Sequence, residues 1–148
     1  MDDSTIISDL IESYWDSIPP SWHRTRAVIR AIAMEKYHLT VEQFQTLRRI
    51  RKGQHSVSLL AETTQTSRSA VSRVVDGMVN KGMIARGLDP NDRRNIPLTL
   101  TEEGQRVMAD IYDQTEDWLA SRFSHLTSKE SEQLNEALSI LSRLFNNP

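Results

Sequence analysis

Serine and arginine side chains gather where a short polar turn meets the beginning of a helix-forming stretch. The turn runs from Thr64 to Ser67 and separates a short apolar stretch from a longer one with a helical repeat. Arginine can donate two hydrogen bonds to one guanine, and serine can bond either a base or a phosphate. This chemistry suits contact with a nucleic acid. The candidate residues are Ser67, Arg68, Ser69, Ser72 and Arg73.

A second charged group lies in a turn sequence further along the chain. Residues 89–92, Asp-Pro-Asn-Asp, are a strong turn signal between two stretches that read as strands, Met83–Leu88 and Arg93–Leu100. An arginine at the tip of such a hairpin can enter the minor groove of DNA, where narrow tracts concentrate negative potential. Asp92 could orient Arg94 by a charge-assisted pair, although a surface turn of mixed charge is the alternative. The candidate residues at this tip are Asp92, Arg93 and Arg94.

The N-terminal segment predicts two helical stretches. Pro19 and Pro20 are expected to interrupt the first, because proline lacks a backbone N–H and clashes with the preceding turn. Ser21 is then expected to cap the second. Both stretches carry apolar residues at spacings of three and four, as one face of a helix requires. These residues are Ile7, Leu10, Ile11, Tyr14, Trp15 and Ile18, and then Trp22, Val28, Ile29, Ile32 and Ala33.

The middle segment predicts the elements that would position both charged groups. Thr40 and Gln43 have the spacing of a capping box, in front of a helix that Gly53 ends. A short helix over Ser56–Thr64, the polar turn and a longer helix over Arg68–Lys81 follow, and then the hairpin. This order is a helix-turn-helix followed by a wing, in which the second helix enters the major groove of DNA. The opposite face of that helix is predicted to be buried, through Val71, Val75 and Met78.

The last segment predicts two more helices. Thr101 is an N-cap, and acidic residues in the first turn suit the helix dipole. Thr127 caps the final helix. Terminal helices with apolar faces can pack within one chain or across a two-fold axis, and the second case presents two recognition helices to half-sites about 10–10.5 base pairs apart. The apolar residues are Val107, Met108, Ile111, Tyr112, Leu119 and Phe123, and then Leu134, Leu138, Leu141 and Phe145.

The net charge of −2 conceals an uneven distribution along the 148 residues. Residues 1–39 carry −2, residues 40–100 carry +5 and residues 101–148 carry −5. From charge alone, a solvated basic face and a nucleic-acid partner are equal alternatives. The basic block coincides with the predicted helix-turn-helix and wing, which favours the nucleic acid.

Composition excludes several classes of function. The chain has no cysteine, which rules out a disulfide framework, thiolate zinc sites, iron–sulfur clusters and thiol redox switches. It has no apolar run near the roughly 18 residues of a membrane helix, and its acidic N-terminus does not resemble a signal peptide. We therefore expect a cytoplasmic protein with no membrane partner. The four histidines are scattered, and no phosphate loop or nucleophile motif occurs, so neither a metal, a cofactor nor an enzymatic activity is expected.

Residues 56–106 resemble the winged-helix region of the MarR family of bacterial transcriptional regulators. The most specific element is the sequence DPNDRR followed by LTLTEEG, and the helical segments on both sides also fit. The resemblance implies a mainly α fold with a winged helix-turn-helix, a two-stranded β-wing, and N- and C-terminal helices that form a homodimer. The implied regions are 1–39 for N-terminal dimerisation, 40–100 for DNA binding and 101–148 for C-terminal dimerisation, in one intertwined unit.

Three positions depart from the pattern of the family. Gln65 stands where a turn glycine is common. Gly77 lies inside the predicted recognition helix and costs it on the order of 1 kcal/mol. Pro97 cannot donate to a sheet ladder, so its strand is predicted to be an edge or locally irregular. These departures leave the DNA-binding interpretation intact.

The resemblance also implies roles for individual residues. Carried over by position, the base and phosphate contacts fall on the serines and arginines between Ser67 and Arg73, and a wing pair falls on Asp92 and Arg94. Arg86, on the first wing strand, is implied to contact a phosphate. The sequence therefore predicts a sequence-specific DNA-binding regulator, a ligand-responsive repressor that binds a pseudo-palindromic operator as a homodimer. The alternatives are a constitutive DNA-binding regulator without an effector and a winged-helix module that binds protein instead of DNA.

Many members of the family are repressors that small aromatic ligands release from DNA. The resemblance thus implies an effector in the cleft between the dimerisation helices and the DNA-binding region. Aromatic side chains beside a cation would suit an aromatic carboxylate. Aromatic residues at helical spacing are more often part of a core, which is the alternative. The candidate ligand residues are Trp15, Trp22, His23, Arg26, Tyr37, His38 and Phe44.

Overall fold

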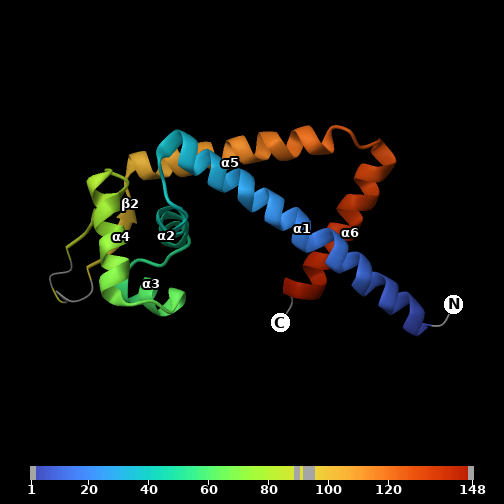
Figure 1. Ribbon diagram of the computed structural model, residues 1–148, viewed down its shortest axis with the longest axis horizontal. Coiled ribbons are helices and arrows are strands. Elements are labelled where there is room, and N and C mark those ends of the chain that lie inside the picture. The colour runs from blue at the N-terminus through green and yellow to red at the C-terminus, as the bar shows by residue number, and fades with distance from the viewer. Residues whose placement is uncertain (1–2, 89–90, 92–95, 147–148) are drawn as a thin grey trace. The chain divides into compact units, whose positions relative to one another are not determined.

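The computed structural model describes residues 3–88, 91 and 96–146 of the chain (Figure 1). The chain folds into two compact units, of which the first ends at Asp113 and the second begins at Gln114. In the described residues, helices dominate and one two-stranded sheet forms the wing, as the sequence predicts. The elements in chain order are α1 (Asp3–Tyr37), α2 (Val41–Arg51), α3 (Val57–Thr64), α4 (Arg68–Asn80), β1 (Ile84–Arg86), β2 (Leu98–Leu100), α5 (Glu102–Phe123) and α6 (Ser128–Asn146).

Helix α1 continues without a break through Pro19 and Pro20, so the predicted interruption is wrong (Figure 1). The predicted cap, Ser21, lies inside the helix, where its hydroxyl donates to the carbonyl of Ser17 at 2.6 Å. Two prolines remove two helical N–H donors. Trp15 and Asp16, whose carbonyls are left without those donors, are exposed, so the carbonyls can bond water instead.

Local capping sets the starts of the next three helices, and the capping box predicted at Thr40 is confirmed. Thr40 and Gln43 form the capping box at the start of α2, with the Gln43 N–H donating to the Thr40 hydroxyl at 3.2 Å. Ser56 caps α3, and Ser67 caps α4 by accepting the Ala70 N–H at 3.1 Å. Between α3 and α4, Gln65 adopts the left-handed conformation with φ of 53°, which explains why a glycine is common at this position.

The sheet is shorter than the sequence predicts. Strands β1 and β2 pair antiparallel, with Ile84 opposite Leu100 and Arg86 opposite Leu98. Pro97 lies outside β2, which agrees with the prediction of an irregular strand, because its ring nitrogen has no hydrogen to donate. Its carbonyl still accepts the Gly87 N–H at 2.7 Å, so the hairpin stays closed just beyond the regular ladder.

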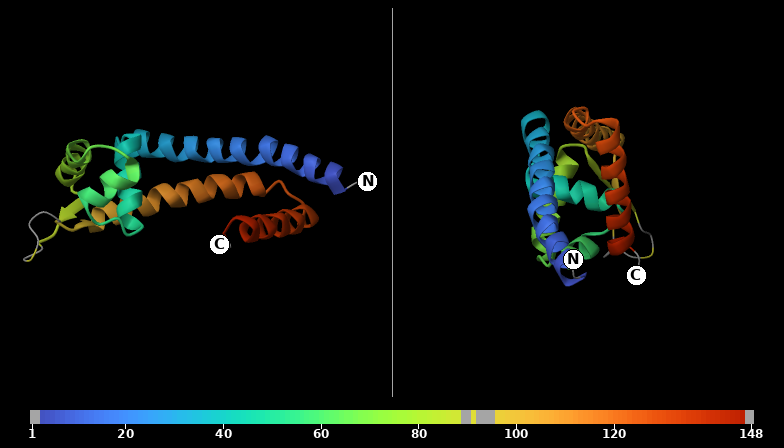
Figure 2. Two further views of the ribbon diagram at one scale, coloured as in Figure 1. Left: turned by 90° about the horizontal axis from the view of Figure 1, so that it is seen from below. Right: turned by 90° about the vertical axis from the view of Figure 1, so that its right-hand side faces the viewer.

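One continuous core holds the first unit together. The buried face of α4 packs with residues of α2, both strands and the first half of α5, and α1 contributes only its C-terminal end. Figure 2 shows the result: α2, α3, α4 and the sheet form a cluster from which α1 extends away. The side chains with no more than 1% exposure are Ala33, Leu39, Leu47, Leu60, Val75, Met78, Leu98, Val107, Met108 and Ile111.

Helix α5 begins close against the first wing strand. The Thr101 hydroxyl caps α5 by accepting the Gly104 N–H at 3.0 Å, as predicted for an N-cap. A Cβ atom on Gly104 would overlap the Met83 carbonyl, so only glycine allows this approach.

The second unit consists of the end of α5 and helix α6. Thr127 caps α6 in a reciprocal box with Glu130, whose carboxylate accepts the Thr127 N–H at 2.8 Å. These hydrogen bonds hold the pKa of Glu130 below its ordinary value. The helices of the described residues include none that is both long and apolar enough to span a membrane.

Candidate nucleic-acid interface

The N-terminal end of α4 presents its polar side chains to solvent. Ser67, Arg68, Ser69 and Arg73 are exposed, and Ser72 is half-buried. The opposite face of the helix lies in the core, which confirms the prediction that Val71, Val75 and Met78 are buried. The core therefore fixes which face of α4 is free. An exposed helix N-terminus also carries partial positive charge, which favours a negatively charged partner.

A hollow of about 330 Å³ lies between α4 and the wing. Arg68, Ser69 and Ser72 line it from α4, and Arg86 lines it from β1. Four of the predicted contact residues are thus brought together from segments that are separate in the sequence. Arg73 is exposed on α4 but does not line this hollow, and Asp92, Arg93 and Arg94 lie outside the described residues. Apolar side chains of Val57, Ile96 and Leu98 complete the lining.

An ion pair connects α4 to the wing beside this hollow. The Arg86 guanidinium lies 2.5 Å from the Asp76 carboxylate, and the two side chains are 36% and 56% exposed. Such an exposed pair contributes little stability, but it restricts where the guanidinium points. Asp76 was not among the predicted residues. An acidic side chain on the polar face of a recognition helix was the available signal, since a carboxylate there would repel DNA unless an arginine neutralised it.

Two other basic residues of the middle segment, Arg51 and Lys81, have partners within the protein. The Arg51 guanidinium lies 4.9 Å from the centre of the Tyr112 ring. The Lys81 ammonium donates to the His38 carbonyl at 2.7 Å, which ties the end of α4 to the loop after α1. Both groups still add positive charge to this region. They also fasten elements together, so only part of the +5 block is available for direct contact.

The predicted ligand residues occupy two different environments. Trp15 and Trp22 on α1 are 65% and 51% exposed, and His23, Arg26 and His38 are exposed as well. The Arg26 guanidinium lies 6.0 Å from the centre of the Trp22 ring. The Tyr37 ring is half-buried, with the Lys36 ammonium 5.6 Å and the Arg106 guanidinium 6.0 Å from its centre. Phe44 is 3% exposed in the core, 6.5 Å from the Tyr112 ring. The ligand role stays a prediction for all of them.

A short helix, a turn, an exposed second helix and an adjoining two-stranded hairpin define a winged helix-turn-helix. Residues 37–95 match the sequence model of the MarR family. The chain is 34% identical over 102 residues to the HTH-type transcriptional repressor MdtR of Bacillus subtilis, an alignment that covers 68% of this chain and 66% of the relative. It is 32% identical over 93 residues to the transcriptional repressor MprA of Escherichia coli, with coverage of 61% and 53%. The chain belongs to the MarR family, and these alignments span less than two thirds of the relatives' own lengths.

Solved structures extend the similarity to the whole fold. The YusO protein of Bacillus subtilis superposes with a TM-score of 0.69 at 26% identity, over 97% of this chain and 99% of that one. Tm0710 of Thermotoga maritima, a transcriptional regulator, gives a TM-score of 0.80 at 21% identity over 93% and 99%. A MepR mutant of S. aureus solved with an oligodeoxyribonucleotide gives 0.71 at 23% identity over 88% and 97%. The terminal helices therefore belong to the shared fold as much as the wing does.

Proposed function

We propose that this chain is a sequence-specific DNA-binding transcriptional regulator. The observation that carries the proposal is the hollow where Arg68, Ser69 and Ser72 of α4 meet Arg86 of the wing. Two elements that are separate in the sequence present hydrogen-bond donors on one surface, as a protein needs to contact bases and phosphates together. The names of the relatives MdtR and MprA, both repressors, support this function and favour repression. A regulator of this kind acts on the chromosome, in the cytoplasm, and needs no enzymatic activity.

The proposed regulator is a homodimer. The outer part of α1 exposes Leu10 and Trp15 at 64% and 65%, and α6 exposes Leu144 and Phe145 at 66% and 68%. Apolar faces of this extent are uncommon on a monomer and are typical of an interface. A two-fold dimer would present two α4 helices to two half-sites, so the operator would be a pseudo-palindrome.

A small anionic effector is part of the same proposal. A hollow of about 380 Å³ in the first unit is lined by Arg51, His55 and Gln105, together with Ile50 and Leu100. The Arg51 side chain that lies over Tyr112 also borders this hollow. A guanidinium beside apolar and aromatic groups suits a small organic acid. A ligand that binds better to one arrangement of the dimer than to the DNA-binding one would lower the affinity for DNA.

The test compares two arginine substitutions on a duplex obtained by selecting binding sites from random DNA. Arg68→Ala removes an exposed guanidinium of the proposed interface. Arg24→Ala removes an exposed one from α1, outside that interface, and is the matched control. We expect Arg68→Ala to weaken binding by about 1–3 kcal/mol, measured by fluorescence anisotropy at fixed salt. Unchanged affinity for Arg68→Ala, or an equal loss for Arg24→Ala, would contradict the assignment of α4 as the reading helix.

A screen of small carboxylic acids against the protein–DNA complex separates a ligand-responsive repressor from a constitutive regulator. Release of DNA by one of them, abolished by Arg51→Ala, is the result expected for an effector in the hollow beside Tyr112. A complex that resists every acid favours the constitutive alternative. A winged-helix module that binds only protein would select no DNA in the first place.

A further inference from the structure

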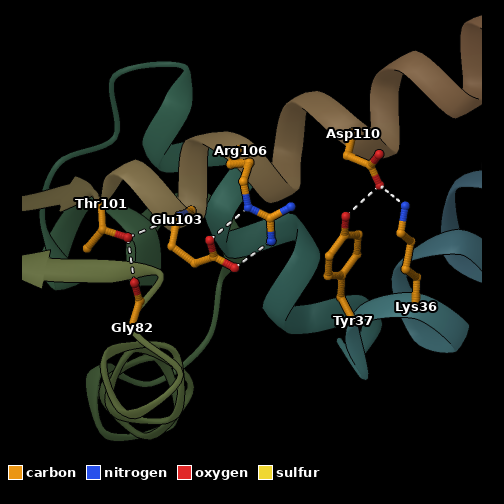
Figure 3. Close-up of polar contacts among 8 residues, drawn as sticks. Lys36, Tyr37, Gly82, Thr101, Glu103, Arg106 and Asp110 are labelled. Atoms are coloured by element: carbon orange, nitrogen blue, oxygen red, sulfur yellow. Dashed lines mark hydrogen bonds and ion pairs between the residues drawn. The ribbon is translucent and has the colours of Figure 1, made fainter.

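Three side chains fasten the last turn of α1 to the middle of α5. The Lys36 ammonium and the Tyr37 hydroxyl both donate to the Asp110 carboxylate, at 2.8 Å and 2.5 Å (Figure 3). Both bonds go to the same carboxylate oxygen, and the donors come from a segment more than 70 residues earlier in the chain. We call Lys36, Tyr37 and Asp110 the α1–α5 latch.

The environment of the latch keeps Tyr37 and Lys36 protonated, so both can donate hydrogen bonds to Asp110. Burial and the hydrogen bond to Asp110 raise the pKa of Tyr37, so its hydroxyl keeps its proton. The hydrogen bond to Asp110 raises the pKa of Lys36, which therefore stays charged. The Tyr37 ring also lies between two cations, with the Lys36 ammonium 5.6 Å and the Arg106 guanidinium 6.0 Å from its centre. The Tyr37 side chain is thus restrained both by the hydrogen bond of its hydroxyl and by the two cations near its ring.

The other end of this part of α5 is fixed to the base of the wing. The Thr101 hydroxyl donates to the Gly82 carbonyl and accepts the Gly104 N–H (Figure 3). Gly104 itself lies directly against the Met83 carbonyl. Gly82 and Met83 connect α4 to β1, so the start of α5 is held at the junction of the recognition helix and the wing. The segment from Thr101 to Asp110 therefore links the reading elements to α1.

Apolar packing anchors only the C-terminal end of α1. Ala33 in α1 and Leu39 just after its end are 1% exposed and hold this end of the helix in the core. Beyond them α1 continues toward its N-terminus with exposed side chains, among them Leu10 and Trp15. A long helix held at one end changes the position of its far end when the angle at the anchor changes. A directional polar contact on the last turn restricts that angle.

We propose that the α1–α5 latch sets the distance between the two reading units of the dimer, and therefore the half-site spacing that the protein accepts. This inference rests on the proposed function, since it needs a dimer on DNA. Asp110 and Tyr37 act as positioning residues, which determine specificity for spacing without contacting DNA. The gain from binding two half-sites at once depends on how well the linked sites match the span between them. A loosened latch reduces that match and leaves each reading unit intact.

Selection of binding sites from a random duplex library tests the inference. The wild type is expected to return inverted repeats with one dominant spacing. Asp110→Ala and the milder Tyr37→Phe, which removes only a hydroxyl, are expected to return the same half-site sequence over several spacings. Asp113→Ala is the matched control, because Asp113 is an exposed carboxylate of the same helix, three residues beyond Asp110 and outside the latch. It is expected to keep the single spacing.

Affinity measurements give a second readout that a general loss of stability would not imitate. For the latch variants, affinity for the inverted repeat should fall roughly tenfold while affinity for a duplex with one half-site stays unchanged. A single dominant spacing in both latch variants, with wild-type affinity for the repeat, would overturn the inference and leave the proposed function intact. A wild-type protein that selects no sequence would overturn the proposed function, and the inference with it.

Discussion

The winged helix-turn-helix and the terminal helices differ in where their apolar side chains lie. Leu47 of α2 and Met78 of α4 are fully buried, whereas Leu10 and Trp15 of α1 are 64% and 65% exposed. The first region completes its core within one chain. The outer part of α1 and the face of α6 do not. The comparison teaches that one chain contains a region with a complete core, attached to helices whose apolar side chains stay exposed.

The largest expected effect comes from truncating a side chain in the core of the winged helix-turn-helix. Met78→Ala removes a fully buried side chain and leaves a cavity. We expect it to lower the free energy of unfolding by about 2–5 kcal/mol in chemical denaturation. The control is Leu88→Ala, which truncates a side chain that is 96% exposed and should change the stability by less than about 0.5 kcal/mol. Similar losses for both variants would show that the core does not lie where the structure places it.

The next largest effect concerns the exposed apolar side chains of α1. Replacing both Leu10 and Trp15 by serine removes two exposed apolar side chains that the proposal places in the dimer interface. We expect the dimer to weaken by about 30-fold or more, because the loss of one interface anchor costs about 2 kcal/mol. Analytical ultracentrifugation measures this, with Glu12→Ser on the same helix as the control. A wild type that sediments as a monomer, or a double variant that stays dimeric, would contradict the proposed dimer interface on α1.

The smallest effect concerns the start of α6. Hydrogen bonds from the Thr127 N–H and hydroxyl lower the pKa of Glu130 below its ordinary 4.5, so the folded state favours the ionised carboxylate. This contribution is present above the ordinary pKa and is lost as the pH falls through the lower, folded value. Between about pH 5 and about pH 3, the free energy of unfolding of the wild type should therefore fall more steeply than that of Glu130→Gln. Equal slopes for both proteins would show that the capping box does not form.

Sequence reasoning succeeded where local chemistry decides the structure. Thr40, Ser56 and Ser67 each accept a hydrogen bond from a backbone N–H a few residues later, so the sequence near each helix start is sufficient to locate it. The buried face of α4 followed from the spacing of its apolar residues in the same way. Sequence reasoning was wrong at Pro19 and Pro20, where it predicted a break in the helix. A helix can tolerate the loss of two N–H donors where water is close, and the local sequence does not show that.

Sequence reasoning did not predict the contacts between segments that are distant in the chain. The Asp76–Arg86 pair joins α4 to β1, and the latch at Asp110 joins α5 to α1. A carboxylate on a helix has the same local pattern whether it faces water or a lysine from another helix, so only the fold distinguishes the two. Both contacts depend on the packing of the core, which brings the paired elements together.

Salt dependence of DNA binding tests the central claim most directly. Affinity of the wild type for the selected duplex is measured by fluorescence anisotropy over a series of salt concentrations. The account predicts a straight line of log affinity against log salt with a steep negative slope, because each phosphate contact releases counterions and contributes about −0.9. Arg86→Ala should make that slope shallower by about 1. A flat line, or the absence of binding to any duplex, would contradict the account and favour a winged-helix module that binds protein.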